Sequence, residues 1–408
     1  MIVLNKEYLA ALEKALKVLS SFVTIFIVSS NISPVVFGTY SIIEIVLFLL
    51  CTFAIGGTDL TSNKIVTDYS IRSSLWPIIK YRFFLSFIAL IGLLLSQLFI
   101  NIDLYSLILS AFIILALPFG VSEQIMYSRG EYVNVYKLKV CLCLISIFIK
   151  LLFYDVDNVI VILLLCFFLE TFFSWILFFI FRFDDLKEKN VIDISVVCNL
   201  SLPTLITTLA IILYSKIDQY MIALFMNQIE LAKYTIVVKI CDSFVFLPTL
   251  VTTLYLPKAY KNGLSEVFIK NYFRLVIILA IFSTFSSFVI YYFYVMLNET
   301  NSVSYDVFTF YLISIILNFI GATISPLQVY RGNVYGRLFR IIFGLVFNFI
   351  LNLYLIPKLG ILGAVYSTIV SLLFSNIILV MFSKDIFMLK YYFYALITLY
   401  KFKIKEIM

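Results

Sequence analysis

The largely hydrophobic stretch 214–242 holds four ionisable residues toward its two ends, Lys216, Asp218, Lys239 and Asp242. A charged group at the centre of a bilayer costs about 2.5–3.5 kcal/mol on insertion scales, so it is kept mainly beside water, an opposite charge or a polar ligand. Lysine attracts phosphate as a point charge, and carboxylates can bind a cation or pair with the lysines. The stretch predicts a membrane hairpin that lines a path for an anionic, lipid-linked substrate.

Helical spacing decides which of these side chains share a face. Lys239 and Asp242 are three residues apart, and therefore lie on one face of a helix. Lys216 and Asp218 are two residues apart and diverge by roughly 200° on a regular helix. At most one of that pair points squarely at a given cavity. The alternative interpretation is that the four groups pair with one another and only hold helices together.

Other apolar segments also contain ionisable residues, namely Glu44, Lys150 and Glu170. They are candidates for the same path, although a long side chain near a helix end can also extend to the membrane surface. The chain contains no histidine, so any proton coupling must use Asp or Glu. Arginines at the segment ends, such as Arg129 and Arg331, are interpreted as topology signals and headgroup anchors, with a gate as the alternative.

Composition indicates a membrane protein. Of the 408 residues, 63% are hydrophobic and only 13% are charged, whereas soluble domains have about 25% charged residues. All six cysteines fall in apolar runs, which argues against disulfides and metal ligation. We therefore expect an all-α integral membrane protein that is not an enzyme, has no cofactor or bound metal and binds no nucleic acid.

Twelve apolar segments are long enough to cross a bilayer at about 1.5 Å per residue. The expected spans are 11–31, 36–58, 78–100, 104–127, 135–154, 158–181, 196–226, 231–256, 272–297, 307–329, 338–356 and 361–382. They predict an N-terminal six-helix lobe (1–182), an inter-lobe loop (183–195), a C-terminal six-helix lobe (196–382) and a basic tail (383–408). The tail's apolar run, 391–400, is too short to cross, and we expect an interfacial helix there, with an unstructured end as the alternative.

Charge distribution predicts the orientation. Most lysines and arginines fall at one set of alternate span ends, and the opposite loops are short and mainly acidic. The positive-inside rule then puts both termini in the cytoplasm. Tyr40 and Tyr234 open spans two and eight in similar contexts, and the pairs Arg129-Gly130 and Arg331-Gly332 also recur about half a chain apart. These matches suggest two parallel six-span halves.

Three motifs carry a resemblance to a known family. They are KIDQ at 216–219, FGTYS at 37–41 and NLYLIPKLGILGAVYST at 352–368. The chain resembles the O-antigen flippases, the Wzx-type polysaccharide exporters of the MOP superfamily. The resemblance implies a MATE-like, V-shaped bundle of two pseudo-symmetric lobes in the bacterial inner membrane. It implies a flippase that translocates undecaprenyl-pyrophosphate-linked O-antigen repeat units to the periplasmic leaflet during lipopolysaccharide biosynthesis.

The resemblance also implies roles for particular residues. Cationic cavity residues would bind the pyrophosphate, and carboxylates would couple transport to H⁺ or Na⁺. The matching cations are Lys216, Lys239, Lys150 and Lys17, and the carboxylates are Asp218, Asp242, Glu44 and Glu170. Besides membrane lipids, a polysaccharide polymerase and a chain-length regulator are the partners to expect.

Two other functions compete with this interpretation. A cation-coupled multidrug exporter of the same fold would favour carboxylates over lysines inside the membrane, and both occur here. A membrane enzyme such as a polymerase would be expected to show a large outer loop with catalytic groups, whereas the predicted outer loops are short.

Overall fold

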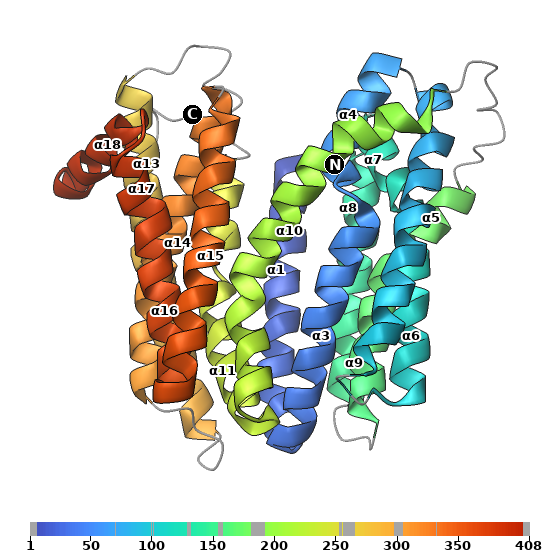
Figure 1. Cartoon of the computed structure of the whole chain (residues 1–408), viewed down its shortest axis with the longest axis horizontal. Helices are drawn as coiled ribbons and strands as arrows, with labels where there is room; N and C mark the ends of the chain where they lie inside the picture. The colour runs from blue at the N-terminus through green and yellow to red at the C-terminus, as the bar shows by residue number, and fades with distance from the viewer. Residues whose placement is uncertain are drawn as a thin grey trace, which may run out of the picture. The chain divides into compact units, whose positions relative to one another are not determined.

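The computed structural model describes residues 6–69, 71–98, 100, 102–128, 132–153, 158–180, 192–252, 255, 266–297, 305–331 and 333–402. Within these residues every regular element is a helix (Figure 1). Ten of the described helices are long and apolar enough to cross a membrane. They are Pro34–Ile55, Ser73–Ser96, Leu104–Glu123, Val159–Leu177, Ile194–Phe225, Gln228–Thr252, Glu266–Leu297, Tyr305–Gln328, Tyr335–Leu359 and Ile361–Met381. The predicted all-α, multi-pass membrane architecture is confirmed.

The predicted count of twelve spans is not confirmed. The two expected spans that are missing from these ten, 11–31 and 135–154, are nevertheless helical. They correspond to α1 (Lys6–Val23) with its short extensions η1 (Thr24–Val28) and α2 (Ser29–Asn31), and to α8 (Tyr132–Leu152). Both helices carry several charged side chains, of which Lys17, Lys139 and Lys150 lie on the walls of the cavities described below.

The chain divides into two compact units, Met1–Leu213 and Tyr214–Met408, here called unit 1 and unit 2. The division falls inside the long helix α10 (Ile194–Phe225). The inter-lobe loop expected at 183–195 lies mostly outside the described residues.

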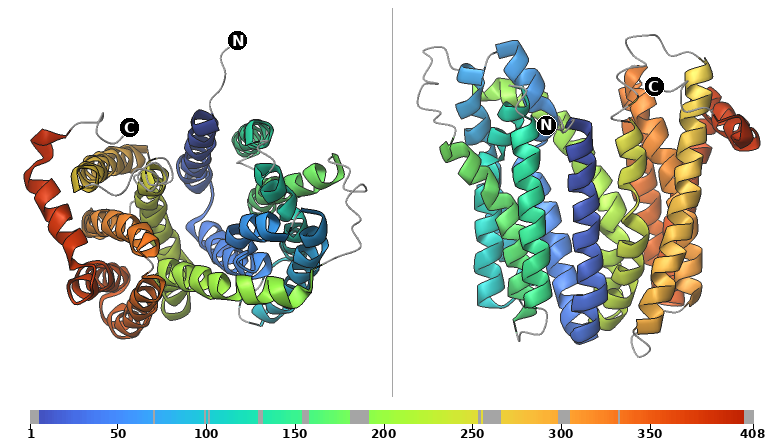
Figure 2. Two further views of the ribbon diagram at one scale, coloured as in Figure 1. Left: turned by 90° about the horizontal axis from the view of Figure 1, so that it is seen from above. Right: turned by 180° about the vertical axis from the view of Figure 1, so that it is seen from behind.

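Unit 1 is built from long helices that run side by side (Figure 2). α1 packs on α8, and two further pairs, α3 with α5 and α6 with α9, enclose a core centred on Ile43, Leu47 and Ile113. Besides α1, η1, α2 and α8, the unit consists of α3 (Pro34–Ile55), α4 (Thr58–Tyr69), α5 (Ile71–Ser96), α6 (Leu104–Ala116), η2 (Leu117–Gly120), α7 (Val121–Ser128), α9 (Val159–Ile180) and the first part of α10.

Unit 2 repeats this side-by-side packing. α16 packs on α15 and α14, and α13 packs on α14. Its elements are the end of α10, α11 (Gln228–Asp242), α13 (Glu266–Leu297), α14 (Tyr305–Tyr330), α15 (Val334–Leu359), α16 (Ile361–Leu373), η5 (Phe374–Ile378), α17 (Leu379–Met381), α18 (Ile386–Ile397) and η6 (Leu399–Lys401).

The C-terminal helix α18 lies obliquely at the side of unit 2, near one end of its long helices (Figure 2). It packs on α13, where the buried side chain of Arg274 donates hydrogen bonds to Thr398 Oγ1 and to the carbonyl oxygen of Lys401. Lys270 lies over the rings of Tyr391 and Tyr394. A short helix in this position fits the predicted interfacial tail.

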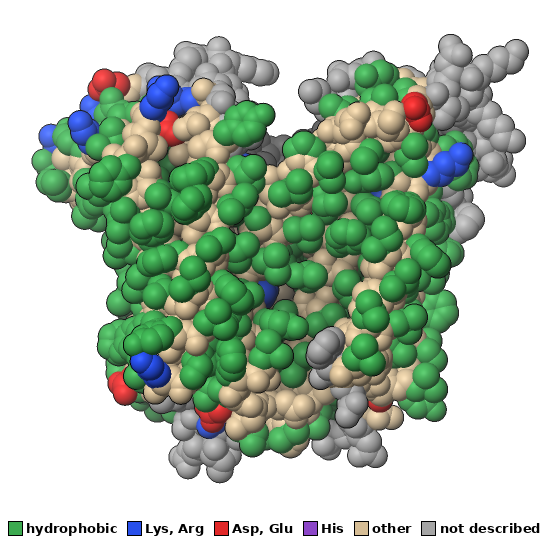
Figure 3. Space-filling model, in the orientation of Figure 1, with side chains coloured by type: hydrophobic (Ala, Val, Ile, Leu, Met, Phe, Trp, Pro, Cys, Tyr) green, Lys and Arg blue, Asp and Glu red, His purple; other side chains and the backbone are tan. Residues whose placement is uncertain are grey.

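The sides of both units are apolar. Figure 3 shows most visible charged side chains at the two ends of each unit, with hydrophobic side chains between them. Large side chains such as Phe84, Phe87 and Phe285 are exposed on these sides. An outward-facing apolar band between charged ends is the surface that a bilayer requires.

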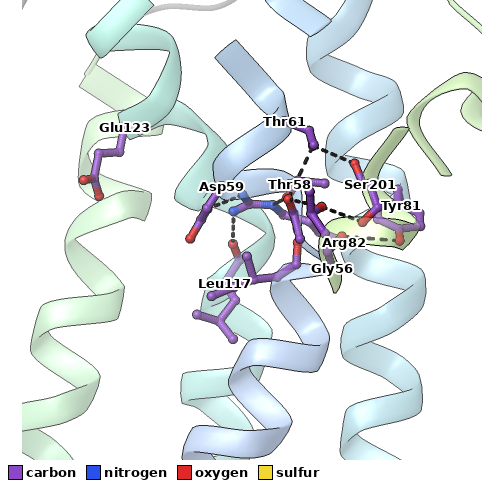
Figure 4. A network of polar contacts seen from close by, with 12 residues as sticks. Gly56, Thr58, Asp59, Thr61, Tyr81, Arg82, Leu117, Glu123 and Ser201 are labelled. Carbon is purple, nitrogen blue, oxygen red and sulfur yellow. Dashed lines mark hydrogen bonds and ion pairs between the residues drawn. The ribbon is translucent and has the colours of Figure 1, made fainter. Parts of the chain in front are cut away.

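A polar network joins the α3–α4 turn to α5 and η2 within unit 1 (Figure 4). Arg82 is 1% exposed and donates to Thr58 Oγ1 at 2.6 Å, to Asp59 Oδ1 at 2.6 Å and to the carbonyl of Leu117 at 3.2 Å. All three guanidinium nitrogens therefore have partners, one of them a carboxylate. This arrangement offsets the cost of burying the charge.

The same turn also contacts the first part of α10. Gly57 has a left-handed φ of 71°, and its carbonyl oxygen accepts a hydrogen bond from Thr204 Oγ1 at 3.0 Å. A Cβ atom on Gly57 would lie 2.5 Å from the backbone nitrogen of Leu205. Only glycine combines this backbone conformation with so close an approach.

We expect Gly57→Ala to destabilise unit 1 by about 2–5 kcal/mol, because left-handed strain of about 1–2 and overpacking of about 1–3 kcal/mol add. Thermal unfolding of the purified protein in detergent measures the change. Gly92→Ala is the matched control, since its Cβ would meet only the flexible end of Leu50 at 3.0 Å. Equal unfolding temperatures for the two variants would contradict this account of the turn.

The helix that carries Lys239 and Asp242 is interrupted just after them. α11 ends at Asp242, and residues 243–245 form a turn before helical structure resumes at 246–252. Pro248 explains the break, because it has no N–H to donate to the Phe244 carbonyl and its ring would clash with that group. Val245 and Leu247 instead donate to Asp242 and Phe244, three residues back, both at 3.0 Å.

Candidate functional site

The packed pair α1 and α8 brings two charged helix faces together in unit 1. Glu13, Lys17 and Ser20 are spaced by four and three residues along α1, so they share a face. Lys139, Cys143, Ser146 and Lys150 form the corresponding row on α8.

One cavity in unit 1, here called the Lys17 cavity, has a volume of about 320 Å³. Lys17, Glu123, Lys139 and Glu170 contribute to its wall. Lys17 pairs with Glu13 at 3.0 Å, and Lys139 lies 3.8 Å from Glu13 and also bonds to Glu123. Glu123 is labelled in Figure 4, to one side of the Arg82 network.

A second cavity, here called the Lys150 cavity, has a volume of about 210 Å³. Its wall includes Tyr40, Glu44, Lys150 and Glu170. The Lys150 ammonium group donates to Ser20 Oγ at 2.8 Å, and the Tyr40 hydroxyl lies within hydrogen-bonding reach of Glu44. Lys150 therefore points into unit 1 and does not extend along the helix toward the membrane surface.

Glu170 lies on the wall of both cavities, together with Phe48 and Phe167. The two cavities therefore adjoin one another. The charged residues on their walls or paired to them are Glu13, Lys17, Glu44, Glu123, Lys139, Lys150 and Glu170. Four carboxylates and three ammonium groups so close together can hold an anion at the lysines or exchange a cation at the carboxylates.

Unit 2 contains a buried carboxylate, Asp218, which is 3% exposed. Its Oδ2 accepts a hydrogen bond from the Tyr234 hydroxyl and another, at 3.3 Å, from Thr368 Oγ1. The N–H of Gln219 donates to Oδ1 at 2.8 Å. Helices α10, α11 and α16 therefore meet at this one side chain, which packs against neutral hydroxyl and amide groups.

Two asparagines on α15 are linked to the turn of α10 that precedes Asp218. Asn348 Nδ2 donates to the carbonyl of Tyr214, which precedes Asp218 by four residues on α10, at 3.4 Å. Asn352 Nδ2 donates to Asn348 Oδ1 at 2.7 Å. The Oδ1 atom of Asn352 is buried and accepts no hydrogen bond from the described residues. An unused buried acceptor is rare and calls for an explanation beyond packing.

The other predicted residues of the central hairpin lie nearby in unit 2. Lys216 is half-buried and close enough to Asp218 and Asp242 to interact with both electrostatically. Lys239 is also half-buried and lies in the last turn of α11, where a positive charge favours the helix dipole. The substrate-binding and coupling roles of these residues remain predictions.

Sequence reasoning missed several members of the site. Glu13, Lys139 and Glu123 complete the charged set around the Lys17 cavity. The i, i+4 spacings of Glu13 with Lys17 and of Lys139 with Cys143 were available as a signal. Tyr234 was noted only as half of an internal repeat, and its bond to Asp218 depends on the packing of α10 against α11.

Comparison with known proteins identifies the fold. No protein-family model and no curated protein matches the chain. Among solved structures, "Lipid II flippase MurJ, inward closed conformation" matches with a TM-score of 0.69 and 15% identity, over 98% of this chain and 94% of that one. The chain has the MurJ- and MATE-type transporter fold. An inward-facing multidrug resistance MATE transporter of the MOP superfamily matches with a TM-score of 0.63 and 12% identity, over 95% and 96% of the two chains.

A third match extends the comparison to another transporter state. The outward-facing form of a multidrug resistance MATE transporter has a TM-score of 0.56 and 12% identity, over 96% of this chain and 95% of that one. These similarities cover almost the whole length of the chain. The predicted MATE-like membrane fold is therefore confirmed.

Proposed function

We propose that the protein is a flippase that moves a pyrophosphate-linked lipid saccharide across the membrane. The observation that carries the proposal is the pair of adjoining cavities in unit 1, where Lys17 and Lys150 lie on the walls of a membrane protein. Lysine side chains beside internal cavities supply the positive field that a phosphate head requires. The similarity to the fold of a lipid II flippase supports the same class of cargo.

The chemistry of the cargo sets what the protein must provide. A polyprenyl tail can stay in the bilayer, but a doubly charged, sugar-bearing head cannot cross hydrocarbon unaided. The head needs a polar path with basic groups, and no bond is made or broken. We propose undecaprenyl-pyrophosphate-linked O-antigen units as this cargo, carried from the inner leaflet of a bacterial inner membrane with both termini in the cytoplasm. A polysaccharide polymerase and a chain-length regulator would then act next.

A cavity in unit 2 offers room for sugars. Its volume is about 670 Å³, within the range of ligand pockets. Phe288, Tyr292 and Tyr305 present exposed aromatic rings, and Glu230 pairs with Lys233 at 3.0 Å on the same wall. Aromatic faces and paired charges together supply apolar contact and hydrogen bonds to a hydroxylated ring.

We further propose that Asp218 couples transport to a cation gradient. Among the described residues no cluster of three or more His, Cys, Asp or Glu side chains could hold a metal ion, so a proton or a monovalent cation suits this part of the chain better than a divalent metal. The residues present fit such a cation, since the Asp218 carboxylate and the Thr368 and Tyr234 hydroxyls are hard oxygen donors in contact with one another. Binding would offset the cost of burying the carboxylate charge.

A cation-coupled multidrug exporter is the second candidate. Two observations favour it. MATE multidrug transporters share the fold, and the carboxylates on or paired to the cavity walls of unit 1, with Glu13 included, number four against three lysines. A cationic drug would use Glu44 and Glu170 where a pyrophosphate would use Lys17 and Lys150.

Complementation separates the two candidates. The gene is expressed in a strain that lacks its own O-antigen flippase, in a panel of repeat-unit backgrounds, and surface polysaccharide is measured. We expect restoration in at least one background, with no change in resistance to cationic drugs. Drug resistance without surface polysaccharide in any background would favour the exporter.

A further inference from the structure

Two arginines lie side by side near the beginning of α15. Arg337 and Arg340 are three residues apart and therefore share a helix face. Arg340 is 3% exposed, and Arg337 is partly buried. α15 begins at Val334 and has no acidic residue in its first turn. Arg337 thus adds a positive charge at the end of the first turn of α15, where the helix dipole favours negative groups.

The charges of these arginines are compensated only in part, because Asp385 acts electrostatically on Arg340 without forming an ion pair with it. Arg340 donates to Asn376 Oδ1 at 3.1 Å and to Ser325 Oγ, and both partners are neutral. Its Nε atom and the Nε atom of Arg337 are buried and have no acceptor among the described residues. Neither guanidinium group forms an ion pair within the described part of the chain.

The carboxylate of Asp385, which lies near Arg340, already has other polar partners. Asp385 Oδ2 accepts hydrogen bonds from Gln328 Nε2 at 2.9 Å and from Asn333 Nδ2 at 2.7 Å. Its Oδ1 lies 3.6 Å from Arg331 Nη1. Asp385 therefore pairs with a third arginine, Arg331, and accepts hydrogen bonds from two side-chain amides.

The remaining described acidic residues of unit 2 are held elsewhere. Glu266 pairs with Lys270, and Glu230 pairs with Lys233. Asp218 and Asp242 lie in the hairpin with Lys216, and Asp306 is in the first turn of α14. Two more, Glu299 and Glu406, fall outside the described residues.

Arg82 of unit 1 is a buried arginine whose charge is compensated within the protein. All three of its guanidinium nitrogens are bonded, one to the Asp59 carboxylate (Figure 4). The positive-inside rule does not explain why Arg337 and Arg340 lack the carboxylate partner that Arg82 has. That rule requires basic residues near the membrane surface and does not require buried ones. A buried arginine without a counter-charge is costly, and a bound anion removes that cost.

We propose that Arg337 and Arg340 form a phosphate-binding site at this end of unit 2. A phosphate presents several acceptor oxygens to two adjacent guanidinium groups and is favoured at a helix N-terminus. Its source is either the phosphodiester of an anionic lipid headgroup or a soluble phosphate. The site stands on the charges of unit 2 alone and is independent of the cargo proposed above.

The test measures ligand binding by the purified full-length protein. Short-chain phosphatidylglycerol and inorganic phosphate are titrated separately, and dissociation constants are obtained from the shift in unfolding temperature. We expect Arg337→Gln to weaken binding about tenfold or more, as the loss of a charged hydrogen bond implies. Lys384→Gln is the matched control, because it removes one exposed positive charge from a loop of the same unit, next to Asp385, and should leave binding unchanged.

A second variant guards against misfolding. Arg340→Lys keeps the buried charge but loses the guanidinium fork, so we expect it to fold and to bind about tenfold more weakly. Binding of the lipid alone assigns the site to a headgroup, and binding of both ligands assigns it to phosphate in general. The proposal is overturned if wild type binds neither ligand, or if Arg337→Gln and Arg340→Lys bind as tightly as Lys384→Gln.

Discussion

Lys150→Gln is expected to lower the rate of lipid-linked saccharide transport by about tenfold to a hundredfold. The variant loses the charged hydrogen bond from Lys150 to the phosphate of the cargo, and a hydrogen bond to a charged group contributes about 1.5–3 kcal/mol. The Lys150 ammonium lies on a cavity wall with Glu44 and Glu170 and donates to Ser20 Oγ at 2.8 Å. Glutamine can keep the hydrogen bond to Ser20 but not the charge. The initial rate per folded protein in proteoliposomes measures the effect.

Two further variants show whether charge is the cause. Lys150→Arg keeps a positive charge and should retain more transport than Lys150→Gln. Lys358→Gln removes an exposed lysine that lies over the ring of Tyr354 at the end of α15, and should transport at the wild-type rate. If Lys150→Gln matches wild type while folding normally, the Lys150 cavity has no part in binding the cargo.

Asp218→Asn is expected to abolish the response of transport to a cation gradient. The carboxylate is 3% exposed and accepts hydrogen bonds from the hydroxyls of Tyr234 and Thr368. Asparagine has nearly the same shape but can neither take up a proton nor neutralise a bound cation. Transport rates are compared with an imposed H⁺ or Na⁺ gradient and with that gradient collapsed.

Tyr234→Phe separates coupling from packing in this experiment. It removes one hydrogen bond to Asp218 but leaves the carboxylate, so the gradient response should weaken without disappearing. Asp242→Asn removes the neighbouring carboxylate as a second comparison. An Asp218→Asn protein that still responds fully to the gradient would exclude Asp218 from the coupling site.

Periodicity and charge predicted the fold well, because a membrane protein must satisfy its backbone hydrogen bonds within helices and cover its sides with apolar residues. The long apolar helices therefore appear where the sequence places them, from Pro34–Ile55 to Ile361–Met381. The span count was harder to predict. α1 and α8 are charged on one face, and length and hydropathy alone do not show that these faces meet each other.

The candidate site was only partly predictable, for the same reason. Lys150, Glu44 and Glu170 were recognised as costly charges, and the structure brings all three to one cavity. Their neighbours Lys139 and Glu13 were not recognised, because the sequence does not show which helix packs against the one that carries them. Without that information, a lysine near a helix end is interpreted as a topology signal. Arg337 and Arg340 were missed likewise, since a sequence does not reveal whether a basic residue is buried.

The most direct test of the central claim is a comparison of two cargoes in proteoliposomes that contain the purified protein. Translocation of a fluorescent pyrophosphate-linked lipid saccharide is measured beside export of the cationic dye ethidium, each with and without a cation gradient. A pyrophosphate-lipid flippase should show gradient-stimulated movement of the lipid saccharide and no movement of ethidium. Export of ethidium without movement of the lipid saccharide would contradict the proposed function.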